Sequence, residues 1–177
     1  MSEAARGYRV WIITASDTAS RGGREDTSGK VIGEIAEKAG YAVAGYTLLP
    51  DDRGGLEKEM RRICDGGLAD LVLTTGGTGF SPRDEMPEAT IAVSQRLAPG
   101  IPQAIRQYSL SLTKRAMLSR AAAGIRGKTL IVNLPGSPAA VRESLEFIIE
   151  ELRHGLDILK GNDADCARNE TGARTGP

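Results

Sequence analysis

The sequence predicts an α/β protein with a mainly parallel central sheet. Short apolar segments rich in β-branched residues alternate with longer segments whose apolar residues recur every three or four positions. The run Leu71, Val72 and Leu73 shows no polar alternation, which is typical of a strand covered on both faces. Right-handed crossovers between such strands place helices on both sides of the sheet.

The expected elements can be placed by their periodicity and by their end signals. Strands are expected at 8–14, 41–49, 70–75 and 129–134. Helices are expected at 29–40, 55–64, 87–96, 99–112 and 138–160. Gly40 can end the first helix, and Pro87 suits the first turn of the third helix. The last helix carries a long apolar stripe along one side. Segment 15–28 is expected to be a polar loop, and 119–126 is assigned to no class.

The composition argues against several classes of protein. Lys plus Arg equal Asp plus Glu at 23 each, so the chain lacks the basic excess of a general nucleic-acid binder. Aromatic residues make up 4%, too few for a base-stacking platform. The two cysteines, Cys64 and Cys166, lack the spacing of zinc ligands. The favoured interpretation is two free thiols in a reducing compartment. The single histidine, His154, lies in a helical stretch, which weakens any serine–histidine or cysteine–histidine mechanism.

The chain is expected to be a cytoplasmic protein with one domain. Its N-terminal segment is short and polar, and no apolar run approaches the length of a membrane span. The length of 177 residues suits a single domain, which is expected over 1–161. Residues 162–177 are polar and aperiodic, so a disordered tail without a function of its own is expected there.

The glycine segment after the third predicted strand is the strongest functional signal. A tight turn with positive φ explains two adjacent glycines, whereas a third, with hydroxyls between, favours a ligand close to the backbone. A strand, a glycine turn and a helix start together bring backbone N–H groups to a phosphate or another anion. The segment contains neither the Gly-Lys-Ser/Thr of a Walker A loop nor Gly-x-Gly-x-x-Gly. The residues concerned are Thr75, Gly76, Gly77, Thr78 and Gly79.

Two aspartates, Asp51 and Asp84, each follow a predicted strand and are expected at one rim of the sheet. Carboxylates beside bound phosphates suit a metal ion, and Mg²⁺ with a nucleoside triphosphate uses one or two of them. A surface ion pair or a helix cap explains either aspartate equally well, and Asp51, next to Asp52, is well placed as an N-cap. Arg83 either clamps a phosphate or pairs with Asp84, and the ion pair is the expected role.

Further polar residues follow the ends of other strands. Ser16 and Asp17 either cap a helix or bind a ligand hydroxyl, while Asp26 suits the cap of the first helix equally well. Gly136 and Ser137 follow the last predicted strand. An N-cap role for Ser137 is compatible with an anion contact at the same place.

Taken in order, these motifs resemble the molybdopterin adenylyltransferase family, the Mog- and MoaB-type proteins that also form a domain of gephyrin. The resemblance extends from about Tyr8 to Gly161, without a departure in the core motifs. It is carried by the segments 16–17, 26–29, 50–52, 73–79, 83–84, 87–90 and 133–138.

The resemblance implies a fold, a reaction and partners. The fold is a three-layer α/β/α sandwich with a mostly parallel central sheet, usually assembled as a homotrimer. In the reaction, the terminal phosphate of molybdopterin attacks the α-phosphorus of ATP, with Mg²⁺ required, and pyrophosphate leaves. A separate insertase, expected as a transient partner, then completes the molybdenum cofactor.

The resemblance also assigns roles by position. Asp51 and Asp84 match the family's two essential aspartates, with a catalytic and metal-binding role. The matches to substrate contacts are Thr75, Gly76, Gly77, Thr78, Gly79, Gly136 and Ser137. Ser16, Asp17 and Asp26 match positions nearer the nucleotide.

Two other hypotheses stay open from the sequence. One is a molybdopterin-binding or scaffold protein without adenylylation, and the other is an unrelated nucleotide-binding α/β domain. The intact pair of Asp51 and Asp84 favours the enzyme. Since the nucleophile is already an anionic phosphate, the low histidine content suits this reaction, which depends on positioning and charge neutralisation.

Overall fold

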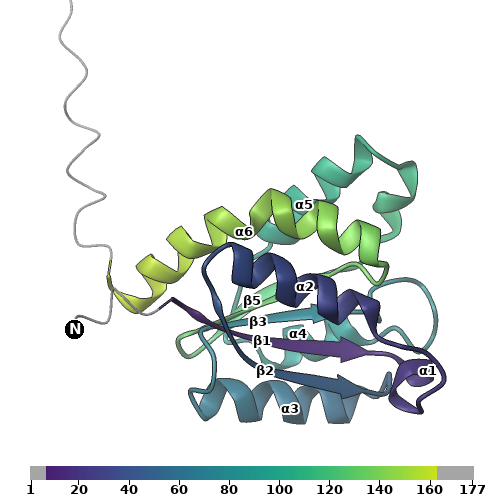
Figure 1. Ribbon diagram of the computed structural model, residues 1–177, viewed down its shortest axis with the longest axis horizontal. Helices are drawn as coiled ribbons and strands as arrows, with labels where there is room; N and C mark the ends of the chain where they lie inside the picture. Colours follow the sequence, from purple (N-terminus) through teal and green to yellow (C-terminus); the bar gives the residue numbers. More distant parts are fainter. Residues whose placement is uncertain (1–6, 163–177) are drawn as a thin grey trace, which may run out of the picture.

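A six-stranded, mostly parallel sheet forms the centre of the protein, as the computed structural model shows for residues 7–162 (Figure 1). The strands lie in the order β2-β1-β3-β6-β5-β4. Neighbours among β1, β2, β3 and β6 are parallel, whereas β5 runs antiparallel to both β6 and β4. The strands are β1 (Arg9–Ala15), β2 (Ala42–Leu49), β3 (Leu71–Thr75), β4 (Arg96–Leu97), β5 (Ala123–Arg126) and β6 (Thr129–Leu134).

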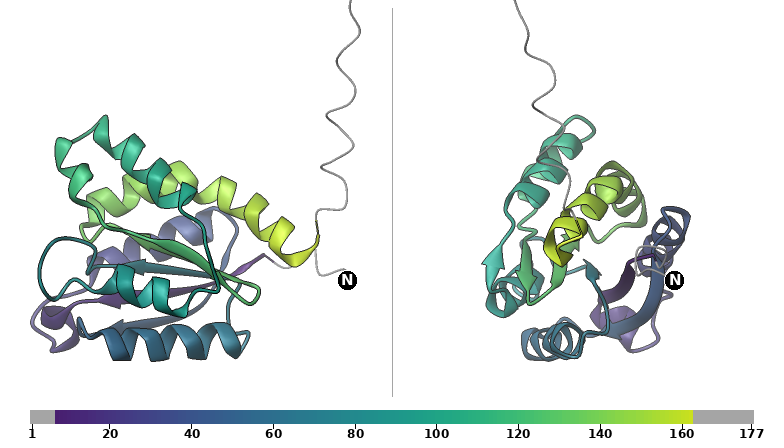
Figure 2. Two further views of the ribbon diagram at one scale, coloured as in Figure 1. Left: turned by 180° about the vertical axis from the view of Figure 1, so that it is seen from behind. Right: turned by 90° about the vertical axis from the view of Figure 1, so that its left-hand side faces the viewer.

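Helices cover both faces of the sheet, which confirms the predicted three-layer architecture. They are α1 (Asp17–Ser20), α2 (Thr27–Lys38), α3 (Arg53–Asp65), α4 (Met86–Val93), α5 (Gly100–Leu110) and α6 (Pro138–Lys160), with a 3₁₀ helix, η2 (Lys114–Leu118). Figure 1 shows α2, α5 and α6 on one side of the sheet and α3 on the other. Seen from behind in Figure 2, α4 lies next to α3.

Each face of the sheet has its own apolar core, because successive strand side chains point to opposite sides. On one face, Ile12 and Leu73 pack with the buried residues of α2, α5 and α6. On the other face, Ile13 and Val72 pack with those of α3 and α4. The strand β3 is buried along its whole length, as its unbroken apolar pattern predicts.

Two of the predicted segments need correction, and the segment left unassigned contains a strand. The expected loop 15–28 contains the short helix α1, which Ser16 caps by accepting a hydrogen bond from the N–H of Ala19. The helix predicted over 87–96 ends at Val93, because Ser94 adopts an extended conformation and its hydroxyl donates to the carbonyl of Thr90. The chain then forms the edge strand β4. The unassigned segment 119–126 contains β5.

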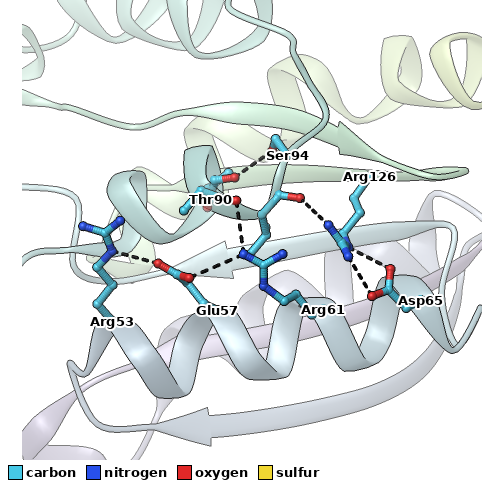
Figure 3. Close-up of polar contacts among 9 residues, drawn as sticks. Arg53, Glu57, Arg61, Asp65, Thr90, Ser94 and Arg126 are labelled. Carbon is cyan, nitrogen blue, oxygen red and sulfur yellow. Dashed lines mark hydrogen bonds and ion pairs between the residues drawn. The ribbon is translucent and has the colours of Figure 1, made fainter.

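Polar contacts tie α3 to α4 and to the end of β5 (Figure 3). Arg61 donates to the carbonyl of Ala92 at 3.2 Å. Arg126 donates to the carbonyl of Val93 at 3.0 Å and forms a two-pronged ion pair with Asp65. These contacts lie along the helix layer and at the edge of the sheet where β5 ends.

The predicted tail, 162–177, lies outside the described residues except for Asn162. Within 7–162, no helix combines the length and apolar character needed to cross a membrane. Cys64 is a buried free thiol on α3, whereas Cys166 lies outside the described part of the chain.

Candidate functional site

The loops after β1, β2, β3 and β6 meet at one edge of the sheet and enclose a cavity of about 510 Å³. Parallel strands bring their carboxyl ends to a common edge, where ligands of α/β proteins bind. Most residues singled out in the sequence line this cavity. They are Ser16, Asp26, Asp51, Thr75, Gly76, Gly77, Asp84, Gly136 and Ser137.

Three of the predicted site residues do not line it. Asp17 lies next to it and contacts Asp51. Thr78 and Gly79 line a second cavity of about 270 Å³, on the side of α5 and η2. The glycine segment therefore forms a wall between two cavities, and only its first half lines the larger one.

Gly76 lies where three loops come into contact. Its φ is +90°, and a Cβ built on it would lie 2.2 Å from the carbonyl oxygen of Ala15. The hydroxyl of Thr75 donates to the carbonyl of Pro135 at 2.6 Å, which joins the loop after β3 to the loop after β6. The close approach of backbones therefore requires glycine at position 76, independently of any ligand.

The other two glycines make room for the two aspartates. A Cβ on Gly77 would lie 3.3 Å from Oδ1 of Asp51, and one on Gly79 would lie 2.8 Å from Oδ2 of Asp84. The spacing of the glycine segment is thus matched to two carboxylates that come from different loops. A larger residue at Gly79 would displace the Asp84 carboxylate.

Asp51 is held at the cavity by hydrogen bonds to the start of α1. Its Oδ2 accepts from the N–H of Asp17 at 2.9 Å, and Oδ1 of Asp17 accepts from the N–H of Asp51 at 3.1 Å. The N-cap of α3 is the neighbouring Asp52, not Asp51. Burial raises the pKa of Asp51, and the negative charges of Asp17 and Asp84 add to the rise.

Asp84 closes a tight turn at the end of the glycine loop, by which we mean residues 76–84 between β3 and α4. Its Oδ2 accepts from the N–H of Ser81 at 3.0 Å, while its own N–H donates to the carbonyl of Ser81 at 2.9 Å. Arg83 does not pair with Asp84 as predicted. Its guanidinium instead binds both oxygens of Asp17, at 3.0 and 2.8 Å, and the hydrogen bond from Arg83 lowers the pKa of Asp17.

The two aspartates suit a divalent cation. Within residues 7–162, Oδ1 of Asp51 and Oδ1 of Asp84 accept no hydrogen bond, and neither carboxylate pairs with a basic side chain. Mg²⁺ is usually held by one or two carboxylates together with substrate phosphates. Across the same residues, no three His, Cys, Asp or Glu side chains are grouped to hold a metal, so a cation held here would need substrate oxygens beside the two aspartates.

Two helix N-termini give another side of the cavity a partial positive charge, opposite in sign to the two aspartates. The first turns of α2 and α6 line it, and these helices are 12 and 23 residues long. Ser137 is the N-cap of α6 and accepts a hydrogen bond from the N–H of Ala140. Helix N-termini attract anions, which suits phosphate groups lying between them and a cation.

Asp26 is fully engaged in local structure. It caps α2 by accepting from the N–H of Gly29, and it accepts from the hydroxyls of Thr14 and Tyr46 at 2.7 Å each. Burial alone would raise the pKa of Asp26, but these hydrogen bonds hold it below the usual value. Of the two roles predicted for Asp26, the helix cap is confirmed, and a contact with a nucleotide stays a prediction.

Some residues near the cavity were not singled out from the sequence. Arg24 and Glu25 line it from the loop before α2, and Ser28 fixes the neighbouring Gly136 by donating to its carbonyl at 2.9 Å. Arg120 contacts the glycine loop from the segment that the sequence left unassigned. Ser28 and Arg120 have no sequence signal, because each acts through a partner distant along the chain.

Comparison with known proteins identifies the family. Residues 11–154 match the family described as a "probable molybdopterin binding domain". The chain belongs to this family.

Relatives in the molybdopterin-binding family include enzymes and solved structures. The Helicobacter pylori protein named molybdopterin adenylyltransferase is 42% identical over 157 residues, which cover 86% of this chain and 88% of that protein. The Escherichia coli protein of the same name is 38% identical over 145 residues, which cover 79% of this chain and 73% of that protein. The crystal structure of the molybdopterin biosynthesis enzyme MoaB from Thermus thermophilus superposes with a TM-score of 0.82 at 45% identity, covering 87% of this chain and 97% of that one.

Proposed function

We propose that this protein is a molybdopterin adenylyltransferase that acts in molybdenum cofactor biosynthesis. The observation that carries the proposal is that Asp51, beside Gly77, and Asp84, beside Gly79, line the same cavity. The chain is also 42% identical to an enzyme of that name. Its substrates are then molybdopterin and ATP, and its products are adenylyl-molybdopterin and pyrophosphate.

The chain's own groups would act by positioning and by charge. The phosphates of the two substrates lie between the N-termini of α2 and α6 and the glycine turn at Gly76 and Gly77. Held in line, the terminal phosphate of molybdopterin attacks the α-phosphorus of ATP as the bond to pyrophosphate breaks. No side chain has to remove a proton from this nucleophile, because the phosphate is already an anion.

Asp51 and Asp84 would hold Mg²⁺, which supplies charge neutralisation for the phosphates when it is bound. Without a cation, the two carboxylates would repel phosphate. Burial first, and then the negative charges of Asp17 and Asp84, already raise the pKa of Asp51. The reciprocal hydrogen bonds with Asp17 keep the Asp51 carboxylate directed at the cavity before the substrates arrive.

Three further properties belong to the same proposal. We infer a homotrimer, an action in the cytoplasm and transfer of the product to a separate insertase. Exposed apolar side chains on α5, η2, the turn between them and α6 support a self-association surface. They are Leu110, Leu112, Met117, Leu118 and Phe147.

Incubation of the purified protein with molybdopterin and ATP tests the function, with adenylyl-molybdopterin and pyrophosphate measured as a function of Mg²⁺. The proposal predicts equal amounts of both products and none without the divalent cation. Tight binding of molybdopterin with no release of pyrophosphate at any Mg²⁺ concentration would instead identify a binding or scaffold protein.

A further inference from the structure

Arg120 binds the glycine loop at three separate points. It lies between η2 and β5, and its backbone N–H donates to the carbonyl of Thr78 at 3.0 Å. Its Nε donates to the carbonyl of Gly79 at 2.7 Å. The remaining guanidinium nitrogens donate to the carbonyl of Asp84 and to the carboxylate of Glu88.

These contacts lie at both ends of segment 78–84, which carries Asp84. Thr78 and Gly79 begin the loop, and Asp84 ends it. Within this segment, the N–H of Ser81 donates to the Asp84 carboxylate. Just outside it, the N–H of Met86 donates to the carbonyl of Gly77 and closes the loop. A single guanidinium therefore fixes the distance between the two ends of the loop, and with it the position of the Asp84 carboxylate.

The chemistry of the guanidinium suits this task. Its planar, rigid arrangement of donors can bind several oxygens at fixed angles, and it stays charged at any working pH. Glu88 supplies the compensating charge, and its Oε2 is buried without a hydrogen-bond partner among the described residues. Arg120 is thus held in place by Glu88 on α4 while its other nitrogens bind the loop.

We propose that Arg120 is a positioning residue for the reaction: it sets the position of Asp84 through the loop backbone and so sets the affinity of the site for the divalent cation. The inference rests on the proposed function. It assigns no contact with substrate to Arg120, and it treats the loop 78–84 as a unit whose geometry depends on this side chain.

The chain offers a matched control in Arg126. This arginine also donates to a backbone carbonyl, that of Val93, and also pairs with a carboxylate, that of Asp65 (Figure 3). It ends β5, which runs antiparallel to β6, so it lies at the opposite edge of the sheet from the glycine loop. Loss of either arginine removes comparable contacts, but only Arg120 contacts the loop that carries Asp84.

Amide hydrogen exchange of the full chain tests the structural part without any metal or substrate. In Arg120→Gln, the amides of Ser81, Asp84 and Met86 are expected to exchange about tenfold faster or more than in the wild type. In Arg126→Gln they keep wild-type rates. Unchanged exchange over 78–86 in Arg120→Gln would overturn the inference, whether or not the protein proves to be an adenylyltransferase.

The Mg²⁺ dependence of turnover tests the functional part. For Arg120→Gln, we expect kcat to fall about 10- to 100-fold and half-saturation to need about tenfold more Mg²⁺, with an unchanged KM for molybdopterin. Arg120→Lys keeps the charge but not the planar donors. It is expected to recover only part of the loss in kcat and part of the loss in Mg²⁺ affinity. Glu88→Gln leaves the two carbonyl contacts in place and should have a smaller effect than Arg120→Gln.

The outcomes separate the two proposals. An inactive wild-type protein contradicts the proposed function, and hydrogen exchange then still decides the role of Arg120. An active wild type with the same Mg²⁺ dependence in Arg120→Gln contradicts the positioning role. If Arg120→Gln does not fold, Arg120→Lys takes its place in both measurements, and a wild-type Mg²⁺ dependence there also overturns the inference.

Discussion

Asp17 and Asp51 each accept a hydrogen bond from the other's backbone N–H, at 3.1 and 2.9 Å. This reciprocal pair joins the start of α1 to the end of β2, although the two residues are 34 positions apart. Arg83 adds a third member, because it binds the side chain of Asp17 from the glycine loop. Three loops that supply the cavity are thereby connected through one carboxylate.

Replacement of Asp17 should therefore affect the reaction through Asp51. Asp17→Ala removes the acceptor for the N–H of Asp51 and the partner of Arg83, and we expect kcat to fall about tenfold. Asp17→Asn keeps an acceptor oxygen and loses only the ion pair, so a smaller fall is expected, equal to that of Arg83→Gln. Steady-state kinetics of the three variants measures this, and an Asp17→Ala enzyme with wild-type kcat would contradict it.

Gly76 and Gly127 allow the backbone argument to be tested on stability. Both have positive φ, but a Cβ on Gly127 would meet nothing within 4 Å, whereas one on Gly76 would collide with the carbonyl of Ala15. Gly127→Ala should lower the free energy of unfolding by about 1 kcal/mol, through backbone conformation alone. Gly76→Ala should lower it by at least about 3 kcal/mol. Urea denaturation compares the two, and equal effects would disprove the close approach at Gly76.

Asp70 predicts a loss of stability in acid. Burial alone would raise its pKa, but hydrogen bonds from Lys160 at 2.5 Å and from Arg9 hold it below the usual 3.8. The pKa of Asp70 is lower in the folded protein than in the unfolded chain. The ionised carboxylate therefore contributes its full stabilisation at any pH above the pKa that it has in the unfolded chain. This stabilisation is lost as the pH falls below about 4 and through the folded pKa.

Urea denaturation at pH 7 and at successively lower pH measures this contribution. Asp70→Asn should destabilise the protein by about 2 kcal/mol at pH 7 and flatten the decline in acid. The more exposed Asp65, whose pKa is lowered by Arg126, provides the control. Asp65→Asn should change the pH profile less, and a wild-type profile in Asp70→Asn would refute the assignment.

The sequence predicted the parts of the fold that repeat a simple pattern. The strands β1, β2, β3 and β6 and the long helix α6 were placed within one or two residues, because periodicity and burial dictate them. The edge strand β4 escaped prediction for a physical reason. Arg96 and Leu97 are both exposed, and their strand exists only because they pair with β5.

The site was predicted as far as strand ends determine it. The rule that parallel strands end at one edge brought Asp51, Asp84, Gly76 and Ser137 to a common cavity, as the structure shows. Which neighbour caps α3, which acid Arg83 binds and what Arg120 contacts could not be read from the chain. These depend on side-chain directions and on loops that meet only in the folded protein.

Release of pyrophosphate by the wild type and by Asp51→Asn and Asp84→Asn tests the central claim most directly. Each substitution keeps the size of the side chain and removes a charge from the pair that we assign to Mg²⁺. With molybdopterin, ATP and saturating Mg²⁺, we predict release by the wild type and a fall of about 100-fold or more in each folded variant. Wild-type rates in both variants would contradict the account of this site.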